Sequence, residues 1–164
     1  MQLLKIILAI AVLMYVCIGC AKRQNSTYPS IEQIKNFSMQ NNLKVLDEKN
    51  IDNVFSVILY EDNERYGYYI LYLDSKGVLR NDNYYNVVDN NSKLYIAGQS
   101  SGKPFIVVVF NDMSLLDVAA AIKFQYANGK SDIFQLSEKK KGKIIPISNE
   151  ASAPSGYLNP LLKA

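Results

Sequence analysis

The sequence predicts a mainly β domain, either an antiparallel β-sandwich or a partly open barrel, with one N-terminal helix. Short apolar segments with a period of two recur between residues 43 and 147, and turn residues separate them. One segment with helical spacing precedes them, and the strands do not alternate with helices as a parallel sheet requires. The chain has 164 residues, which is enough for one such domain.

The helix is predicted at residues 31–40. Ser30 and Gln33 form a capping-box pattern at its start, and Asn41 and Asn42 end it. Its apolar residues, which recur at helical spacing, are Ile31, Ile34 and Phe37. We expect this stripe to pack on the sheet that follows.

A β-hairpin is predicted from residues 54–61 and 66–73, joined by the polar loop 62–65. If Glu61 pairs with Tyr66, apolar side chains from both strands share one face of the sheet. Those side chains are Phe55, Val57, Leu59, Tyr68, Ile70 and Tyr72, while Ile58 and Tyr69 meet on the other face. Both faces are apolar enough to be covered.

Weaker signals surround the hairpin. They predict a short strand at 43–45, a turn at 74–77, an irregular excursion at 81–91 rich in Asn, Asp and Tyr, a strand at 93–97 and a loop at 98–102.

Residues 105–110 read Phe-Ile-Val-Val-Val-Phe, an unbroken apolar run. Such a run is typical of a strand that is buried on both faces, so we place it at the centre of a sheet. Further expected elements are helical turns at 113–120, strands at 121–127 and 132–137 around the turn Asn128-Gly129, and a strand at 143–147.

The N-terminal segment has the pattern of an export signal. Lys5 is followed by an apolar stretch from Ile6 to Ile18, which is shorter than the ~20 residues that span a bilayer. The stretch ends in Cys17-Ile18-Gly19-Cys20, with a small residue before the last Cys. An uncleaved N-terminal anchor and plain secretion are the alternatives that this segment leaves open.

The motif Cys17-Ile18-Gly19-Cys20 resembles the lipobox of bacterial lipoprotein precursors, with Cys17 where that family usually has Leu. The resemblance implies that residues 1–19 are a cleaved signal peptide. It also implies that Cys20 carries the lipid, palmitate included, which holds the chain on the extracytoplasmic face of the cell membrane. Residues 20–29 then form a flexible tether, residues 30–150 a single β-rich domain and residues 151–164 an irregular C-terminal tail.

The order of elements between residues 105 and 137 resembles the later strands of immunoglobulin-like sandwiches. The Tyr66-Gly67-Tyr68-Tyr69 and Gly102-Lys103-Pro104-Phe105 stretches are similar to ones in small uncharacterised bacterial lipoproteins. The first resemblance implies a sandwich topology, and the second implies a location in the envelope but no activity.

Composition excludes several classes of function. The chain has no His, which excludes Ser-His-Asp and Cys-His catalysis, and its two Cys lie at the end of the export segment. A redox or zinc site at Cys17 and Cys20 would need a second ligand pair that the chain lacks. The net charge of +3 is too small for a nucleic-acid-binding surface. We expect no cofactor and no resident metal.

Acidic and basic clusters leave two alternatives open. Carboxylates in loops 61–65 and 111–117, among them Glu61, Asp62, Glu64, Asp112 and Asp117, would serve an envelope hydrolase or a solute-binding protein. Two Asp/Asn clusters are weak calcium candidates: Asp62-Asn63-Glu64, and Asp82-Asn83 with Asp89-Asn90-Asn91. The basic cluster Lys139-Lys140-Lys141 with Lys143 is either a solvated hairpin tip or a contact for anionic lipid or cell-wall polymer.

The chain contains 12 Tyr, and six of them gather in two short stretches. They are Tyr66, Tyr68, Tyr69, Tyr72, Tyr84 and Tyr85. Tyrosine suits strand packing and also serves partner surfaces, because its ring is apolar and its tip is polar. The sequence therefore favours a non-enzymatic binding or structural module of the envelope, whose tyrosine-rich face contacts a protein or cell-wall polymer.

Overall fold

The computed structural model describes residues 28–63, 65–87, 92–99, 102–126, 129–147 and 157–162. The expected signal peptide at residues 1–19, the expected lipidation site Cys20 and most of the expected tether lie outside the described residues. Within the described ranges, no helix is both long enough and apolar enough to cross a membrane.

The described residues form two helices and ten strands, which turns and loops connect. Their bounds are α2 (Ile31–Gln40), β1 (Lys44–Ile51), β2 (Phe55–Asp62), β3 (Arg65–Leu73), β4 (Leu79–Val87), β5 (Leu94–Gln99), β6 (Phe105–Phe110), α3 (Met113–Val118), β7 (Ala119–Gln125), β8 (Ser131–Gln135), β9 (Gly142–Pro146) and β10 (Tyr157–Leu162).

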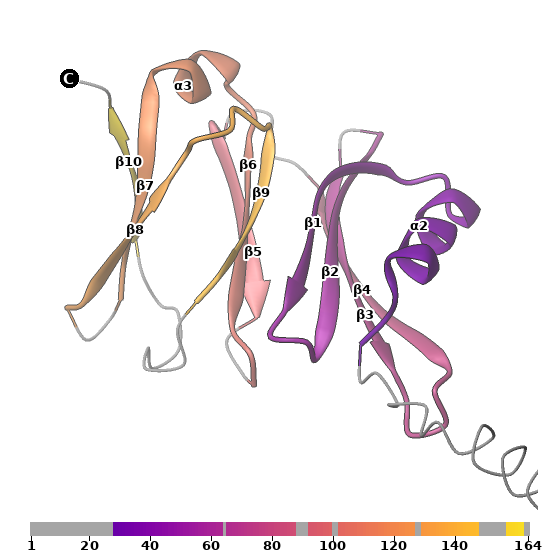
Figure 1. Ribbon diagram of the computed structural model, residues 1–164. Helices are drawn as coiled ribbons and strands as arrows, with labels where there is room; N and C mark the ends of the chain where they lie inside the picture. The colour runs from indigo at the N-terminus through magenta and orange to yellow at the C-terminus, as the bar shows by residue number, and fades with distance from the viewer. Residues whose placement is uncertain are drawn as a thin grey trace, which may run out of the picture.

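The strands form three antiparallel sheets that stack face to face, with α2 as an outer layer (Figure 1). The first sheet has the order β1-β2-β3-β4, the middle sheet β5-β6-β9 and the third sheet β10-β7-β8. The predicted class is confirmed, because the described part is mainly β, antiparallel and sandwich-like, and its strands form no closed barrel. A β-sandwich has two sheets, and this protein has a third sheet that packs on the middle one.

Helix α2 covers the outer face of the first sheet. The capping box is present, since the Gln33 amide donates to Ser30 Oγ at 3.2 Å and the Ser30 amide donates to Gln33 Oε1 at 2.9 Å. Ile34 is buried against the sheet with Ile58 and Leu71, as the helical stripe predicts. Ile31 differs from that prediction, because it lies in the first turn and is exposed.

The hairpin of β2 and β3 has the register that the sequence predicts. Glu61 pairs with Tyr66, Leu59 with Tyr68 and Ile58 with Tyr69. Ile58 and Tyr69 face α2, while the alternate residues face the middle sheet. Both faces are covered, as expected for a strand pair whose two faces are apolar.

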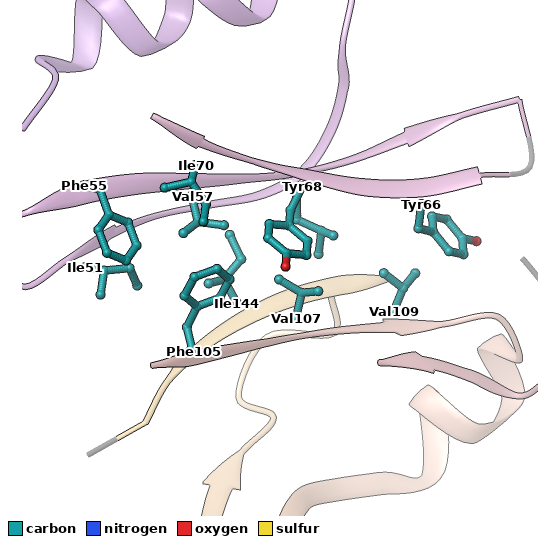
Figure 2. Close-up of a cluster of buried hydrophobic side chains, with 11 residues drawn as sticks. Ile51, Phe55, Val57, Tyr66, Tyr68, Ile70, Phe105, Val107, Val109 and Ile144 are labelled. Carbon is teal, nitrogen blue, oxygen red and sulfur yellow. The ribbon is translucent and has the colours of Figure 1, made fainter. Parts of the chain in front are cut away.

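Strand β6 is buried on both faces, as its unbroken apolar sequence predicts. Phe105, Val107 and Val109 point to the first sheet, where Figure 2 shows them opposite Tyr66, Tyr68 and other side chains of β2 and β3. Ile106, Val108 and Phe110 point to the third sheet and pack with β7 and α3. The middle sheet therefore contributes to two separate hydrophobic cores.

The first and middle sheets meet along the β1–β9 side. The Ile144 amide of β9 donates a hydrogen bond of 2.8 Å to Asp47 Oδ2 of β1. Gly142 allows the close approach, because a Cβ there would lie 2.7 Å from Leu46 and 2.8 Å from Leu59. On the opposite side, β4 and β5 are the edge strands of their sheets.

Three segments differ from the sequence prediction. The first strand is not limited to 43–45 but runs from Lys44 to Ile51 and includes a bulge between Val45 and Asp47. Residues 81–91 were expected to be irregular, yet 81–87 belong to β4, which pairs along the whole of β3. The expected irregular tail contains β10, which pairs with β7. β4 and β10 are edge strands, where low hydrophobicity and Pro160 are tolerated.

Truncating a side chain on either face of β9 should destabilise the whole domain. Ile144 is buried in the first core and Ile145 in the second. We expect Ile144→Ala and Ile145→Ala each to lower the free energy of unfolding by about 2–5 kcal/mol in urea titrations. Ile133→Ala on β8 is the control, because its side chain is exposed, and it should cost less than about 0.5 kcal/mol. An Ile145→Ala variant as stable as Ile133→Ala would contradict the packing of the third sheet.

Candidate functional site

The structure divides the six tyrosines of the expected surface between three environments. Tyr66 and Tyr68 point into the first core and are each 5% exposed, and Tyr72 packs against the same core. The Tyr68 hydroxyl donates to the Gly98 carbonyl of β5 at 3.2 Å, which joins the first and middle sheets. These three side chains therefore act mainly in packing.

Tyr69 faces the opposite way, toward α2. The rings of Tyr69 and Phe37 pack edge to face, with their centroids 5.0 Å apart. Tyr69 also stacks on Tyr60 of β2 at 5.2 Å. This second aromatic group fixes the outer face of the first sheet beneath the C-terminal end of the helix.

Tyr84 and Tyr85 are the exposed members of the group, with exposed fractions of 47% and 60%. They are neighbours on β4 and point to opposite faces of the sheet, because Tyr84 pairs with Tyr68 and Tyr85 with Gly67. Tyr84 stacks on Tyr68 at 5.0 Å. The edge strand therefore presents one tyrosine ring on each of its faces.

Two hollows flank β4 and share Asn83 and Tyr85. The edge groove, about 470 Å³, lies between β4 and β5 and is bordered by Tyr84, Tyr95 and Ile96. The helix-side hollow, about 350 Å³, lies between the outer face of the first sheet and the end of α2. Both volumes fall in the range of small-ligand sites. The tyrosine surface is thus a ridge between two concave regions.

Tyr60, Asn83 and Tyr95 line these hollows but do not belong to the surface expected from the sequence. The predicted hairpin register contains a signal for Tyr60, because it places Tyr60 opposite Gly67, which has no side chain. The positions of Asn83 and Tyr95 depend on β4 and on the contact between two sheets. The hydrophobic periodicity of the sequence predicts neither the strand β4 nor that contact between sheets.

The carboxylates of the 111–117 loop have structural partners. Asp112 caps α3 and accepts hydrogen bonds from the Ser114 amide at 2.9 Å and from its hydroxyl at 2.6 Å. These bonds hold the pKa of Asp112 below its usual value. Asp117 forms an ion pair with Lys139 at 3.1 Å. Asp112 therefore contacts Ser114 and Asp117 contacts Lys139, and the two carboxylates do not form a pair with each other.

Glu61 lies at the end of β2 between two lysines. Lys141 approaches Glu61 Oε1 at 2.6 Å and Lys44 approaches Oε2 at 2.7 Å. The hydrogen bonds from Lys141 and Lys44 lower the pKa of Glu61, in that order of size. Lys141 also lies 5.1 Å from the centroid of the Tyr66 ring. The group links the first sheet to the segment that leads into β9.

The basic cluster has partners within the domain. Lys139 pairs with Asp117 and Lys141 with Glu61. Lys140 pairs with Glu138 at 2.7 Å, and Lys143 donates to the Gln135 carbonyl at 2.9 Å. These contacts favour the solvated-tip interpretation over a contact for an anionic polymer.

The two calcium candidates are only partly described. Asp62 and Asn63 lie at the β2–β3 turn and Asp82 lies on β4, whereas Glu64 and residues 89–91 fall outside the described residues. Across the described ranges, no three Asp, Glu, Cys or His side chains gather as ligands for one ion.

Comparisons with protein-family models, with curated proteins and with solved structures found no match for this chain. The class that the fold and the site define is a mainly β protein of three stacked sheets with a tyrosine ridge on one edge strand.

Removing the charge of Glu61 should weaken the domain in a pH-dependent way. The pKa of Glu61 is lower in the folded protein than its ordinary 4.5, so its ion pairs stabilise the fold above pH 4.5. That stability is lost as the pH falls through the folded-state value. We expect Glu61→Gln to lower the free energy of unfolding at pH 7 by about 1–2 kcal/mol.

Chemical denaturation between about pH 3 and pH 8 measures the effect, because this range spans the titration of a glutamate side chain. The difference between wild type and Glu61→Gln should shrink as the pH falls below 4.5. Glu138→Gln is the matched control, because its partner Lys140 lies on the exposed surface. Equal stability of wild type and Glu61→Gln at pH 7 would show that the lysine pairs do not hold the sheets together.

Proposed function

We propose that this protein is an extracytoplasmic lipoprotein, anchored to the cell membrane through Cys20, whose β domain binds a partner and performs no catalysis. The Cys17-Ile18-Gly19-Cys20 motif after an apolar export segment supports the anchor. Helix α2 begins at Ile31, directly after the capping residue Ser30. Ser30 follows Cys20 by ten positions along the chain, which gives a reach of up to roughly 30 Å at ~3.3 Å per residue.

The tyrosine ridge at Tyr84 and Tyr85 is the observation that carries the binding role. Two adjacent tyrosines are about half exposed or more, on an edge strand between two hollows. Large exposed rings with polar tips are enriched at binding surfaces, because they bury much area at a low cost in side-chain entropy. A tyrosine that only packs a core, such as Tyr66, is covered.

The arrangement of the carboxylates supports a role without catalysis. Asp112 caps a helix, while Glu61 and Asp117 are paired with lysines. A general acid–base pair needs two titratable groups directed at one reacting position. The contacts of these three residues instead hold loops and sheets in place.

Replacing the lipidated residue tests the anchor. We expect Cys20→Ala to give an unprocessed precursor without lipid, which migrates more slowly on a denaturing gel and incorporates no labelled palmitate. Cys17→Ala is the matched control, because it keeps the Cys that the lipobox would modify. If Cys20→Ala is processed and labelled like the wild type, the lipoprotein assignment is wrong.

Site-specific crosslinking tests the binding role. A photoreactive phenylalanine analogue at position 85 should give a discrete adduct in intact cells, whereas the same analogue at position 133 should not. Ile133 is a fair control because it is also exposed but lies on β8 in the third sheet. Equal adduct yields at both positions, or none at position 85, would remove the ridge as the contact surface.

A further inference from the structure

The helix-side hollow is a built site rather than a chance depression. Its floor and wall come from three adjacent strands, where Tyr60 of β2 is opposite Gly67 of β3, which is opposite Tyr85 of β4. The end of α2 closes one side through Asn41 and Asn42. Strand residues held in register are positioned more firmly than residues on a loop.

Gly67 makes room for the floor of the hollow. A Cβ at position 67 would lie 2.5–2.8 Å from three atoms of the Tyr60 side chain, the hydroxyl oxygen among them, so any larger residue would displace that side chain. The Tyr60 hydroxyl reaches β4 and donates to Asn83 Oδ1 at 2.9 Å. Tyr69 stacks on Tyr60, and Phe37 supports Tyr69 from the helix. The aromatic floor is therefore fixed before any ligand arrives.

Polar groups of several kinds surround the aromatic side chains. Asn41, Asn42 and Asn83 carry amides, which both donate and accept hydrogen bonds. Asp62 supplies acceptors and Arg65 supplies a planar set of donors, and both are exposed at the hairpin end. Asn41 donates to the Phe37 carbonyl and Asn83 Oδ1 accepts from Tyr60, and both amides keep further hydrogen-bonding capacity. An apolar ligand would bury that capacity and the Asp62 and Arg65 groups without partners, which costs free energy.

Among the described residues, charges of both signs lie at the hollow. Glu61 is compensated by Lys44 and Lys141. Asp62 and Arg65 have opposite charges, and the ion pairs formed among the described residues involve neither of them. An anion would face Asp62 and a cation would face Arg65, so the rim favours a ligand without net charge.

We propose that the helix-side hollow binds a neutral saccharide. The apolar face of a sugar ring packs on the exposed ring of Tyr85, and its hydroxyls exchange hydrogen bonds with Asn83, Asp62 and Arg65. The volume of about 350 Å³ is near the lower end for ligand sites, which fits a mono- or disaccharide unit. This inference rests on the proposed binding function and names the chemistry of the ligand.

Binding is measured with the full-length protein in a polyoxyethylene detergent, whose headgroup is not a sugar. The neutral probes are cellobiose, maltose and di-N-acetylchitobiose, and the charged probes are glucuronate and glucosamine. Because the chain has no Trp, its intrinsic fluorescence reports on tyrosine directly. We expect saturable quenching by at least one neutral probe and weaker binding of both charged probes.

Two variants place the binding site. Tyr85→Ala should weaken binding on the order of tenfold, because it removes the exposed ring. Tyr84→Ala removes the neighbouring ring on the other face of the same strand, so it distinguishes this hollow from the edge groove and should weaken saccharide binding less than Tyr85→Ala does. Ile133→Ala is the control, because it removes an exposed side chain on β8 in the third sheet, and it should change the affinity less than about twofold. Asp62→Asn should shift the preference toward glucuronate by leaving Arg65 as the uncompensated charge at the rim.

Two results would overturn the inference. One is the failure of every neutral probe to saturate, and the other is a loss of binding in Tyr84→Ala but not in Tyr85→Ala, which would move the site to the edge groove. Neither result removes the proposed binding function, which the crosslink from position 85 tests independently. A specific crosslink to a protein together with no saccharide binding would keep the binding module and exclude this ligand class.

Discussion

The side chains of β6 alternate between two hydrophobic cores, and the stacking of the three sheets depends on that strand. Val107 and Val108 are adjacent in the chain, yet each is fully buried in a different core. Both faces of β6 are covered, which is unusual for a strand of an antiparallel sheet with only three strands. Contacts along the β1–β9 side leave β4 as a free edge, and this arrangement exposes Tyr84 and Tyr85.

Much of this architecture can be predicted from local sequence. The unbroken apolar run at residues 105–110 requires burial on both faces, and the alternation in 54–73 determines the hairpin register. The strand at 79–87 is not predictable in this way, because Asn and Asp disfavour strands and only pairing with β3 overrides that preference. Residues 157–162 pair with β7, a long-range contact that carries little local signal.

The site is less predictable than the fold, since it depends on which strand is left at an edge. Composition identifies tyrosine as the unusual residue, but it does not distinguish Tyr68, which packs the core, from Tyr85, which is exposed. That distinction comes from the strand alternation combined with the position of β4 in the sheet. Asn83 enters the site because β4 pairs with β3, and the Tyr60 hydroxyl then donates to it.

Native-state hydrogen exchange of the β6 amides tests the central claim most directly. If β6 joins both cores, its amides at 105–110 should exchange only through global unfolding and should be among the slowest in the chain. The paired amides of β7 should show a similar free energy of opening, because the third sheet packs on the same strand. If the β7 amides exchange through a separate opening of much lower free energy while the β6 amides stay protected, this account is contradicted.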